Sequence, residues 1–343
     1  FAAVASPSQT SAQAAEPCTD AVAACTEWIP VESGRSLVYR NLPLDTRNEA
    51  VTHALVMVHG AGRNADDYYR TALAAAFLAD RLETSLVIAP RIASNDGGCN
   101  DALAEDEISY DCSTWRSGGP SPSHPDATSF HFLDQILRQV ARRDLFPNLE
   151  SIVVTGHSAG GQVTNRYAMS NVAHEEVGVP VSYVISNPSS YAWPTSDRPT
   201  RNAWSLEASA PGFTFDVDDG GAAFRPGGQG RGCTRYDQWA YGYQNREGYT
   251  ARFSDEQLRT QLAERATTYL LSQVDILPLS GFDSSCAAMA QGPTRRARGE
   301  AYARYVNERL GGNHDLIVVT GCAHSNRCVY TDDRGLGVLF PER

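Results

Sequence analysis

A serine between small residues stands at the centre of the most informative stretch of this sequence. Residues 156–160 read Gly-His-Ser-Ala-Gly, a G-x-S-x-G pattern that is followed by another glycine. A β-branched run precedes the pattern and a segment of helical composition follows it, which predicts a sharp strand-to-helix turn. Glycines on both sides would relieve the crowding of such a turn and leave the hydroxyl of Ser158 exposed. The pattern therefore predicts that Ser158 is a nucleophile.

A serine hydroxyl is a weak nucleophile at neutral pH, so it needs a base within hydrogen-bonding reach and a carboxylate to orient that base. Of the eight histidines, His324 is the best candidate, because it follows a late apolar run at 315–320 and a short turn. His314 precedes that run and is expected at the opposite end of the sheet. His157 and His59 are interpreted as structural, and His59 is expected to order a nearby loop.

Two aspartates are candidates for the orienting carboxylate. Asp275 ends the apolar segment 266–275, which places it at the carboxyl end of a predicted strand. It also lies between Ser158 and His324 in the sequence. Asp283 follows in a loop rich in Gly and Ser and could reach the base instead. We expect Asp275 to be the acid and keep Asp283 as the alternative.

These residues resemble the α/β-hydrolase superfamily over roughly residues 35–340. The nucleophile turn of that superfamily matches residues 156–160, and its order of serine, acid and histidine matches Ser158, Asp275 and His324. Ser272 stands where this family usually has glycine before the acid. The chain looks similar to secreted esterases related to polyhydroxybutyrate depolymerases and feruloyl esterases. This narrower likeness depends on an HGAG turn at 59–62, the chain length and paired cysteines.

The resemblance also implies where a developing oxyanion would find hydrogen-bond donors. These are the backbone amides of Ala159 and Ala61, although backbone donors need no particular side chain and are located only approximately. The HGAG turn contains G-x-G, but the further glycine and acidic residue of a nucleotide site are not in the required context. Residues 216–220 resemble part of a calcium loop without its closing Glu. We therefore predict no metal and no cofactor.

Four aromatic side chains are candidates for binding substrate. Ligands of open α/β sheets bind at the carboxyl ends of the strands, and several of these aromatics follow such ends. The alternative for each is packing in the core or at the rim. The candidates are Tyr68, Trp115, Tyr191 and Trp193.

The elements that must position these residues alternate between two patterns. Short apolar runs bounded by Gly, Pro or Asn are typical of strands covered on both faces, and they occur at 53–58, 85–91, 150–155, 181–186 and 315–320. Helical spacing of apolar residues occurs at 66–82, 129–143, 254–266 and 296–310, and Ser254 precedes Gln257 in a capping-box pattern. This alternation predicts an α/β fold with a mostly parallel central sheet flanked by helices.

Residues 188–250 interrupt the alternation and are rich in Gly, Pro and aromatic residues. We predict a loop-rich cap or rim insertion there, within a single domain over 17–343; a peripheral insertion without a role at the site is the alternative. Residues 1–16 are small and polar, and are expected to be a flexible leader left from the end of an export signal.

Composition restricts the function further. The net charge of −11 disfavours nucleic acid as a partner. Mean hydropathy of −0.35 and the absence of a long apolar run predict no membrane span. The eight cysteines favour disulfides in an oxidising compartment, and hence a secreted protein. Their spacing favours three local bridges and leaves one distant pair, although sequence alone does not fix connectivity: Cys18/Cys25, Cys99/Cys112, Cys322/Cys328 and Cys233/Cys286.

The sequence thus predicts a secreted serine hydrolase that cleaves carboxylic esters through Ser158, His324 and Asp275. Polymeric or plant-wall esters are the substrates that the family resemblance suggests. A peptidase, an amidase or an acyltransferase could use the same residues, and a non-catalytic binding module is a further alternative. The sequence does not define the oligomeric state.

Overall fold

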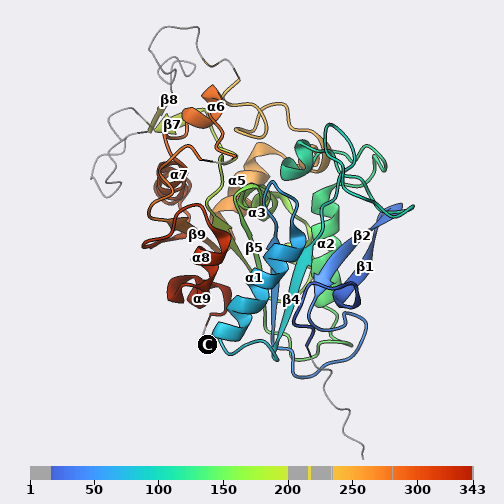
Figure 1. Cartoon of the computed structure of the whole chain (residues 1–343). Helices are drawn as coiled ribbons and strands as arrows, with labels where there is room; N and C mark the ends of the chain where they lie inside the picture. Colours follow the sequence, from blue (N-terminus) through green and yellow to red (C-terminus); the bar gives the residue numbers. More distant parts are fainter. Residues whose placement is uncertain (1–16, 200–214, 218–232, 234, 280, 342–343) are drawn as a thin grey trace, which may run out of the picture.

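An eight-stranded sheet forms the centre of the computed structural model, which describes residues 17–199, 215–217, 233, 235–279 and 281–341 (Figure 1). Its strand order is β1-β2-β4-β3-β5-β6-β9-β10. The pairs β1–β2 and β2–β4 are antiparallel and the remaining pairs are parallel. The strands are β1 Thr26–Val31, β2 Gly34–Arg40, β3 His53–Val58, β4 Ser85–Pro90, β5 Ser151–His157, β6 Val181–Ser186, β9 Thr267–Ser272 and β10 Asp315–Val319.

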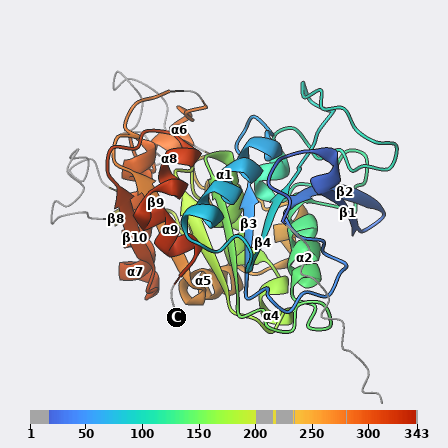
Figure 2. The ribbon, with the colours of Figure 1, turned by 60° about the horizontal axis from the view of Figure 1, so that its bottom comes forward.

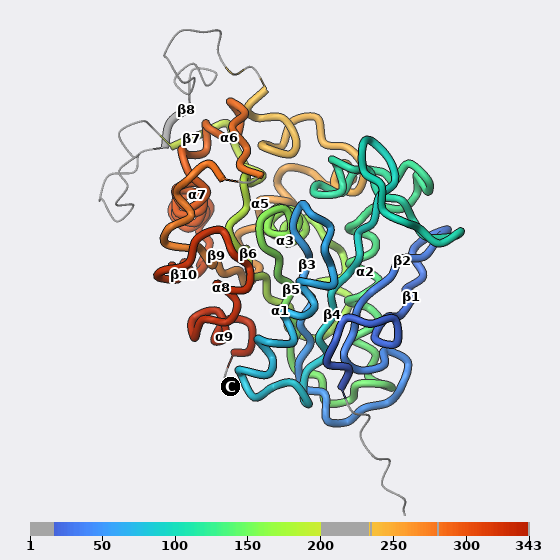
Figure 3. The backbone as a smooth tube through the Cα atoms, in the orientation of Figure 1, coloured from blue at the N-terminus to red at the C-terminus, as the bar shows by residue number. Residues whose placement is uncertain are grey.

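Helices cover both faces of this sheet (Figures 1 and 2). One layer contains α1 Ala65–Leu78, α8 Asn326–Thr331 and α9 Asp333–Leu339. The other contains α2 Ser129–Val140, α3 Ala159–Ser170, α5 Asp255–Glu264 and α7 Arg295–Leu310. Figure 3 shows α1 beside α8, although the two are far apart in the sequence. The shorter helices are η1 Ala23–Cys25, η2 Thr114–Ser117, α4 Ala173–Glu176, η4 Gly248–Arg252 and α6 Cys286–Met289.

The parallel strands end together along one edge of the sheet. Val58 of β3 is level with Gly156 of β5, and Ser186 of β6 is level with His157 on one side and Leu270 on the other. Every residue of β3 and β4 is buried, as expected for apolar strands covered on both faces. The segments that follow β3, β5, β9 and β10 therefore emerge near one another, and they carry most of the residues singled out in the sequence.

The expected α/β fold is confirmed, and each of the five apolar runs forms a strand. The capping box at Ser254 and Gln257 is present at the start of α5. The sequence pattern did not predict the hairpin of β1 and β2, because its outer positions are partly exposed and polar. Helix α1 ends at Leu78, short of the expected residue 82, and Asp80 then adopts a positive φ of 55°.

Four disulfides connect the eight cysteines in the expected pairs: Cys18–Cys25, Cys99–Cys112, Cys233–Cys286 and Cys322–Cys328. Within the described ranges, every helix is too short or too polar to span a bilayer.

The expected insertion at 188–250 is described only in part. A short antiparallel pair joins β7 Asp197–Pro199 to β8 Phe215–Val217. Residues 200–214, 218–232 and 234 lie outside the described residues, as do the expected leader 1–16 and most of the calcium-like segment 216–220. The placement of the whole insertion as a cap therefore stays a prediction.

Four histidines are held in the interior: His53, His59, His157 and His314. Burial lowers the pKa of His53, His59 and His314 from 6.5 to about 4. Between these two values the unfolded chain binds protons that the folded protein does not, so the unfolding free energy is fully retained above about pH 6.5 and falls as the pH approaches 4.

We expect the melting temperature to fall between pH 6.5 and pH 4. His53→Asn, which removes one of these titrations while keeping a polar group near Ser151, should make the fall smaller. Scanning calorimetry at several pH values measures both slopes. Equal slopes for the variant and the parent protein would contradict the assignment.

Candidate active site

The backbone of Ser158 turns sharply between β5 and α3. Its φ of 59° and ψ of −118° are unusual for a residue with a side chain, and its amide donates to the carbonyl oxygen of Ser186 at 3.0 Å. The flanking glycines permit this path. A Cβ on Gly160 would collide with the carbonyl oxygen of Val58, and a Cβ on Gly156 would collide with the backbone of Gly160.

A chain of hydrogen bonds runs from the hydroxyl of Ser158 through the imidazole of His324 to the carboxylate of Asp275. His324 Nε2 lies 3.0 Å from Ser158 Oγ, and His324 Nδ1 lies 2.7 Å from Asp275 Oδ2. Only 2% of the Asp275 side chain is exposed. An imidazole placed in this way can accept the serine proton, while the buried carboxylate fixes its orientation and stabilises its charged form.

Covalent and capping contacts hold the loop that carries His324. The Cys322–Cys328 disulfide closes a short ring around this loop. Ser325 then caps α8, because its Oγ accepts from the amide of Cys328 at 3.3 Å. The backbone on both sides of His324 is thereby restrained.

Asp275 has a second partner that the sequence analysis did not identify. Arg295, at the start of α7, donates from its Nη1 to Asp275 Oδ1 at 3.3 Å and is fully buried. Its Nε also donates to Ser189 Oγ at 2.9 Å. The sequence contained a sign of this contact. The helix dipole disfavours an arginine in the first turn of a helix, so an arginine there indicates that an anion lies nearby.

The turn after β3 faces Ser158. Gly60, Ala61, Gly62 and Tyr68 line a cavity of about 600 Å³ together with Ser158 and His324. The amide of Ala159 is the first in α3 and so has no partner within that helix. The expected positions of Ala61 and Ala159 are therefore compatible with donors that converge near the hydroxyl.

His59 holds this turn in place through two hydrogen bonds. Its Nε2 accepts from the amide of Ile92 at 3.1 Å, which leaves Nδ1 to donate to the carbonyl oxygen of Gly60 at 2.9 Å. Burial keeps His59 neutral by lowering its pKa to about 4. The neutral ring thus connects the turn to the segment that follows β4.

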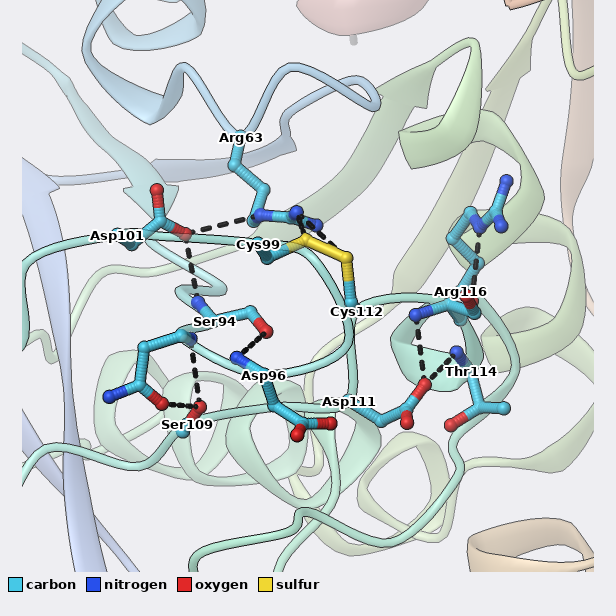
Figure 4. Close-up of a disulfide and its surroundings, with 12 residues drawn as sticks. Arg63, Ser94, Asp96, Cys99, Asp101, Ser109, Asp111, Cys112, Thr114 and Arg116 are labelled. Atoms are coloured by element: carbon cyan, nitrogen blue, oxygen red, sulfur yellow. Dashed lines mark hydrogen bonds and ion pairs between the residues drawn. A yellow bond between two sulfur atoms is a disulfide. The ribbon is translucent and has the colours of Figure 1, made fainter.

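Arg63 anchors the far side of the same turn (Figure 4). Its Nε lies 3.1 Å from Asp101 Oδ2, and its guanidinium lies against the Cys99–Cys112 disulfide. Asp101 also accepts from the amide of Ser94 at 2.8 Å. The long loop that follows β4 therefore supports the turn beside Ser158.

His157 packs against the site without joining the hydrogen-bonded chain. Its ring centroid lies 4.5 Å from that of His324, and its Nδ1 lies 3.5 Å from the hydroxyl of Tyr68. Burial, with the nearby charges of His324 and Arg295, holds the pKa of His157 well below its usual range. A neutral His157 avoids charge repulsion beside the imidazole of His324.

The four aromatic candidates divide into two groups. Tyr68 lines the cavity at Ser158. The expectation for Trp115, Tyr191 and Trp193 is corrected, because all three are buried in the core and none lines that cavity. Trp115 packs on His59 with a centroid distance of 5.1 Å, and Tyr191 stacks on Tyr302 at 4.5 Å. Their large apolar area is used for packing.

The alternative base and acid lie elsewhere. His314 precedes β10 and contacts the hydroxyl of Tyr269 at 2.9 Å. Asp283 accepts from the hydroxyl of Tyr241 at 2.6 Å, away from His324. Asp275 is thus the candidate acid that contacts the imidazole.

The family of the chain follows from comparison with known proteins. The model of a family described as the Alpha/beta hydrolase family matches residues 55–336, most of the chain. The chain belongs to the alpha/beta hydrolase family. No curated protein matches this alpha/beta hydrolase at a significant level.

Solved structures share its fold. A poly(aspartic acid) hydrolase-1 from Sphingomonas sp. KT-1 is 20% identical with a TM-score of 0.58, and the match covers 89% of this alpha/beta hydrolase and 94% of that chain. A poly(3-hydroxybutyrate) depolymerase from Bordetella parapertussis is 19% identical with a TM-score of 0.55, covering 90% and 89% respectively.

The geometry predicts how Ser158 should react with a fluorophosphonate probe. The probe should label this residue, because the hydroxyl can pass its proton to His324. His324→Ala should abolish labelling on the same timescale. Arg295→Met should slow it by about tenfold, since Asp275 would lose the cation that helps to fix it. Labelling rates and the modified peptide are measured by mass spectrometry.

Arg304→Met is the matched control, because Arg304 lies on the same helix but pairs with Glu308 near the surface. Its labelling rate should equal that of the parent protein. Equal rates for Arg295→Met and Arg304→Met would argue against a positioning role for Arg295, and a partial rescue by Arg295→Lys would support one.

Proposed function

We propose that this alpha/beta hydrolase cleaves carboxylic esters by a two-step acyl transfer at Ser158. The observation that carries the proposal is the hydrogen-bonded chain, with 3.0 Å between Ser158 Oγ and His324 Nε2 and 2.7 Å between His324 Nδ1 and Asp275 Oδ2. The hydrogen-bonded chain ends at a cavity that the turn at Gly60–Gly62 also lines, so a substrate carbonyl has space beside the hydroxyl of Ser158.

In the first step, Ser158 Oγ forms a bond to the ester carbonyl carbon while its proton passes to His324 Nε2. Asp275 stabilises the imidazolium. The carbonyl oxygen becomes an oxyanion, which the amides of Ala61 and Ala159 are proposed to bind. The intermediate then collapses, the bond to the alcohol oxygen breaks, and His324 returns the proton to the departing alcohol.

In the second step, water replaces the alcohol. His324 takes a proton from the water as its oxygen attacks the acyl carbon, and Ser158 leaves with that proton. No cofactor enters either step. Since the Cys322–Cys328 disulfide restrains the loop of His324, the same imidazole is held in place for both transfers.

The substrate class and the location are further parts of the proposal. The structural likeness to a poly(3-hydroxybutyrate) depolymerase supports an ester, with polymeric or plant-wall esters as candidates. Exposed apolar side chains near Asp275 offer a surface for such a substrate: Val274, Leu277 and Leu279. Four disulfides support secretion to an extracellular or periplasmic compartment.

Amide hydrolysis is the second candidate. Another structural neighbour is a poly(aspartic acid) hydrolase, and amide bonds link such a polymer. The same residues could cleave an amide, but an amine is a poorer leaving group than an alcohol and depends more strongly on protonation by His324.

A panel of p-nitrophenyl esters of increasing acyl length, with polymer films beside it, tests the proposal. Ser158→Ala should lower kcat/KM by at least about a thousandfold, as expected when a member of a cooperating set is removed. Matched p-nitroanilides distinguish amidase activity, and added glycerol reveals acyl transfer through its transfer products. Variant activity close to that of the parent protein would refute the role of Ser158.

A further inference from the structure

A second cavity of about 360 Å³ opens beside the candidate active site. Gly281 lines both cavities. Gln162, one helical turn after Ser158 on α3, also lines the second cavity, and its side chain donates to Ser190 Oγ at 2.7 Å. The two cavities therefore adjoin, and their shared wall includes the first turn of the helix that carries the nucleophile.

Arg166 projects from the next turn of α3 into this second cavity. Only 3% of the residue is exposed. Its guanidinium donates to the carbonyl oxygen of Ala240 at 2.9 Å, to the carbonyl oxygen of Arg116 at 3.1 Å and to Ser190 Oγ at 3.1 Å. All of these acceptors are neutral, and no carboxylate of the described residues comes within ion-pair distance of it.

Arg116 contributes a second guanidinium to the same cavity. Figure 4 shows its side chain directed away from Asp111 and from the Cys99–Cys112 disulfide. Its Nε donates to the carbonyl oxygen of Ser113 at 3.1 Å. Like Arg166, Arg116 forms no ion pair with the described residues.

One carboxylate lines the described part of the cavity, and its oxygens are already engaged. Asp283 accepts from the hydroxyl of Tyr241 at 2.6 Å and from the amide of Ser285 at 2.9 Å. Two guanidinium groups thus face one carboxylate in a protein whose net charge is −11. The cavity is a local cationic site on an otherwise acidic molecule.

A buried cation without a counter-ion is costly, because neutral hydrogen bonds recover only part of its hydration. Burial accordingly lowers the pKa of Arg166 to about 9, and the nearby charge of Arg116 adds to this effect. An anion bound between the two guanidinium groups would offset the cost. A carboxylate fits this site. Arg116 uses only its Nε within the described residues, so its two Nη atoms can donate two parallel hydrogen bonds to a carboxylate. Arg166 has one N–H left beside its bonds to Ala240, Arg116 and Ser190.

The second cavity lies close enough to Ser158 for one substrate molecule to reach both. Arg166 is eight residues beyond Ser158, so the two Cα atoms are separated by about 12 Å along the helix axis. Arginine side chains on a helix lean back towards its N-terminus, which brings the guanidinium closer to the hydroxyl. A short aliphatic chain could therefore connect a reacting ester group to the two arginines.

We propose that this cavity binds a carboxylate on the substrate, so that the preferred esters are those of short dicarboxylic or hydroxycarboxylic acids with one free carboxylate. This inference depends on the proposed ester hydrolysis at Ser158. The arginines bind and orient the substrate, and they take no part in the bond changes.

Two matched substrate series test the inference. In one, mono-4-nitrophenyl esters of succinate, glutarate, adipate and suberate are compared with their primary amides, which keep the shape and lose the charge. In the other, the carboxylate lies on the alcohol side, in butyrate esters of ω-hydroxy acids and of the corresponding amides. The free carboxylate should raise kcat/KM by at least about tenfold in one series, the gain expected from a charge-assisted pair.

Arg116→Gln is the principal variant, because it removes one guanidinium from a partly exposed position. The preference for the carboxylate should fall below about threefold, while rates on the neutral amides stay within about twofold of the parent protein. Arg166→Lys keeps a charge and loses the guanidinium hydrogen bonds that fix its position on Ala240 and Arg116, so an intermediate preference is expected. Arg309→Gln removes one charge at the far end of α7 and should retain the full preference.

Failure of this inference can be distinguished from failure of the proposed function. Normal turnover of neutral esters without a carboxylate preference in either series would overturn the cationic subsite and leave the esterase proposal intact. If no ester is turned over, calorimetric titration of Ser158→Ala with adipate and adipamide tests the cavity alone. Adipate binding at least about tenfold tighter than adipamide would support the subsite, and a smaller difference would refute it.

Discussion

The conformation of Ser158 is the constraint on which the site depends. A positive φ on a residue with a side chain costs roughly 1–3 kcal/mol, so neighbouring structure must impose it. That structure is the close approach of α3 to the ends of β3 and β5, where the Gly160 position has no room for a Cβ. The stable interior of the sheet therefore supplies the free energy that keeps one hydroxyl at the surface.

The groups around Ser158 come from distant segments and are fixed by unlike interactions. A disulfide restrains the His324 loop, and a buried ion pair with Arg295 restrains Asp275. The ion pair does not have to add stability, because its desolvation offsets much of its attraction. The ion pair instead fixes the direction of the Asp275 carboxylate. Arg295 also donates to Ser189, and so connects the loop of Asp275 to the wall of the second cavity. One arginine thus contacts both the candidate acid and a residue that lines the second cavity.

The sequence predicted the contacts that depend on strand order and missed those that depend on side-chain packing. Buried parallel strands end at a common edge, so Ser158, Asp275 and His324 could be assigned to that edge from three apolar runs. The same reasoning failed for Trp115, Tyr191 and Trp193, because a position after a strand does not show whether a ring turns outward or inward. Arg295 and Arg166 were missed because their contacts depend on which groups lie nearby in space.

The cysteines lie outside the eight strands of the sheet, in loops, turns and short helices. The strands of the central layers therefore contain no disulfide, whereas the loops that contact Arg63 and carry His324 are each closed by one. Reduction would release these loops and leave the strand pairing of the sheet in place. The bridges thus tie the surroundings of Ser158, and not the sheet, to the oxidation state of the medium.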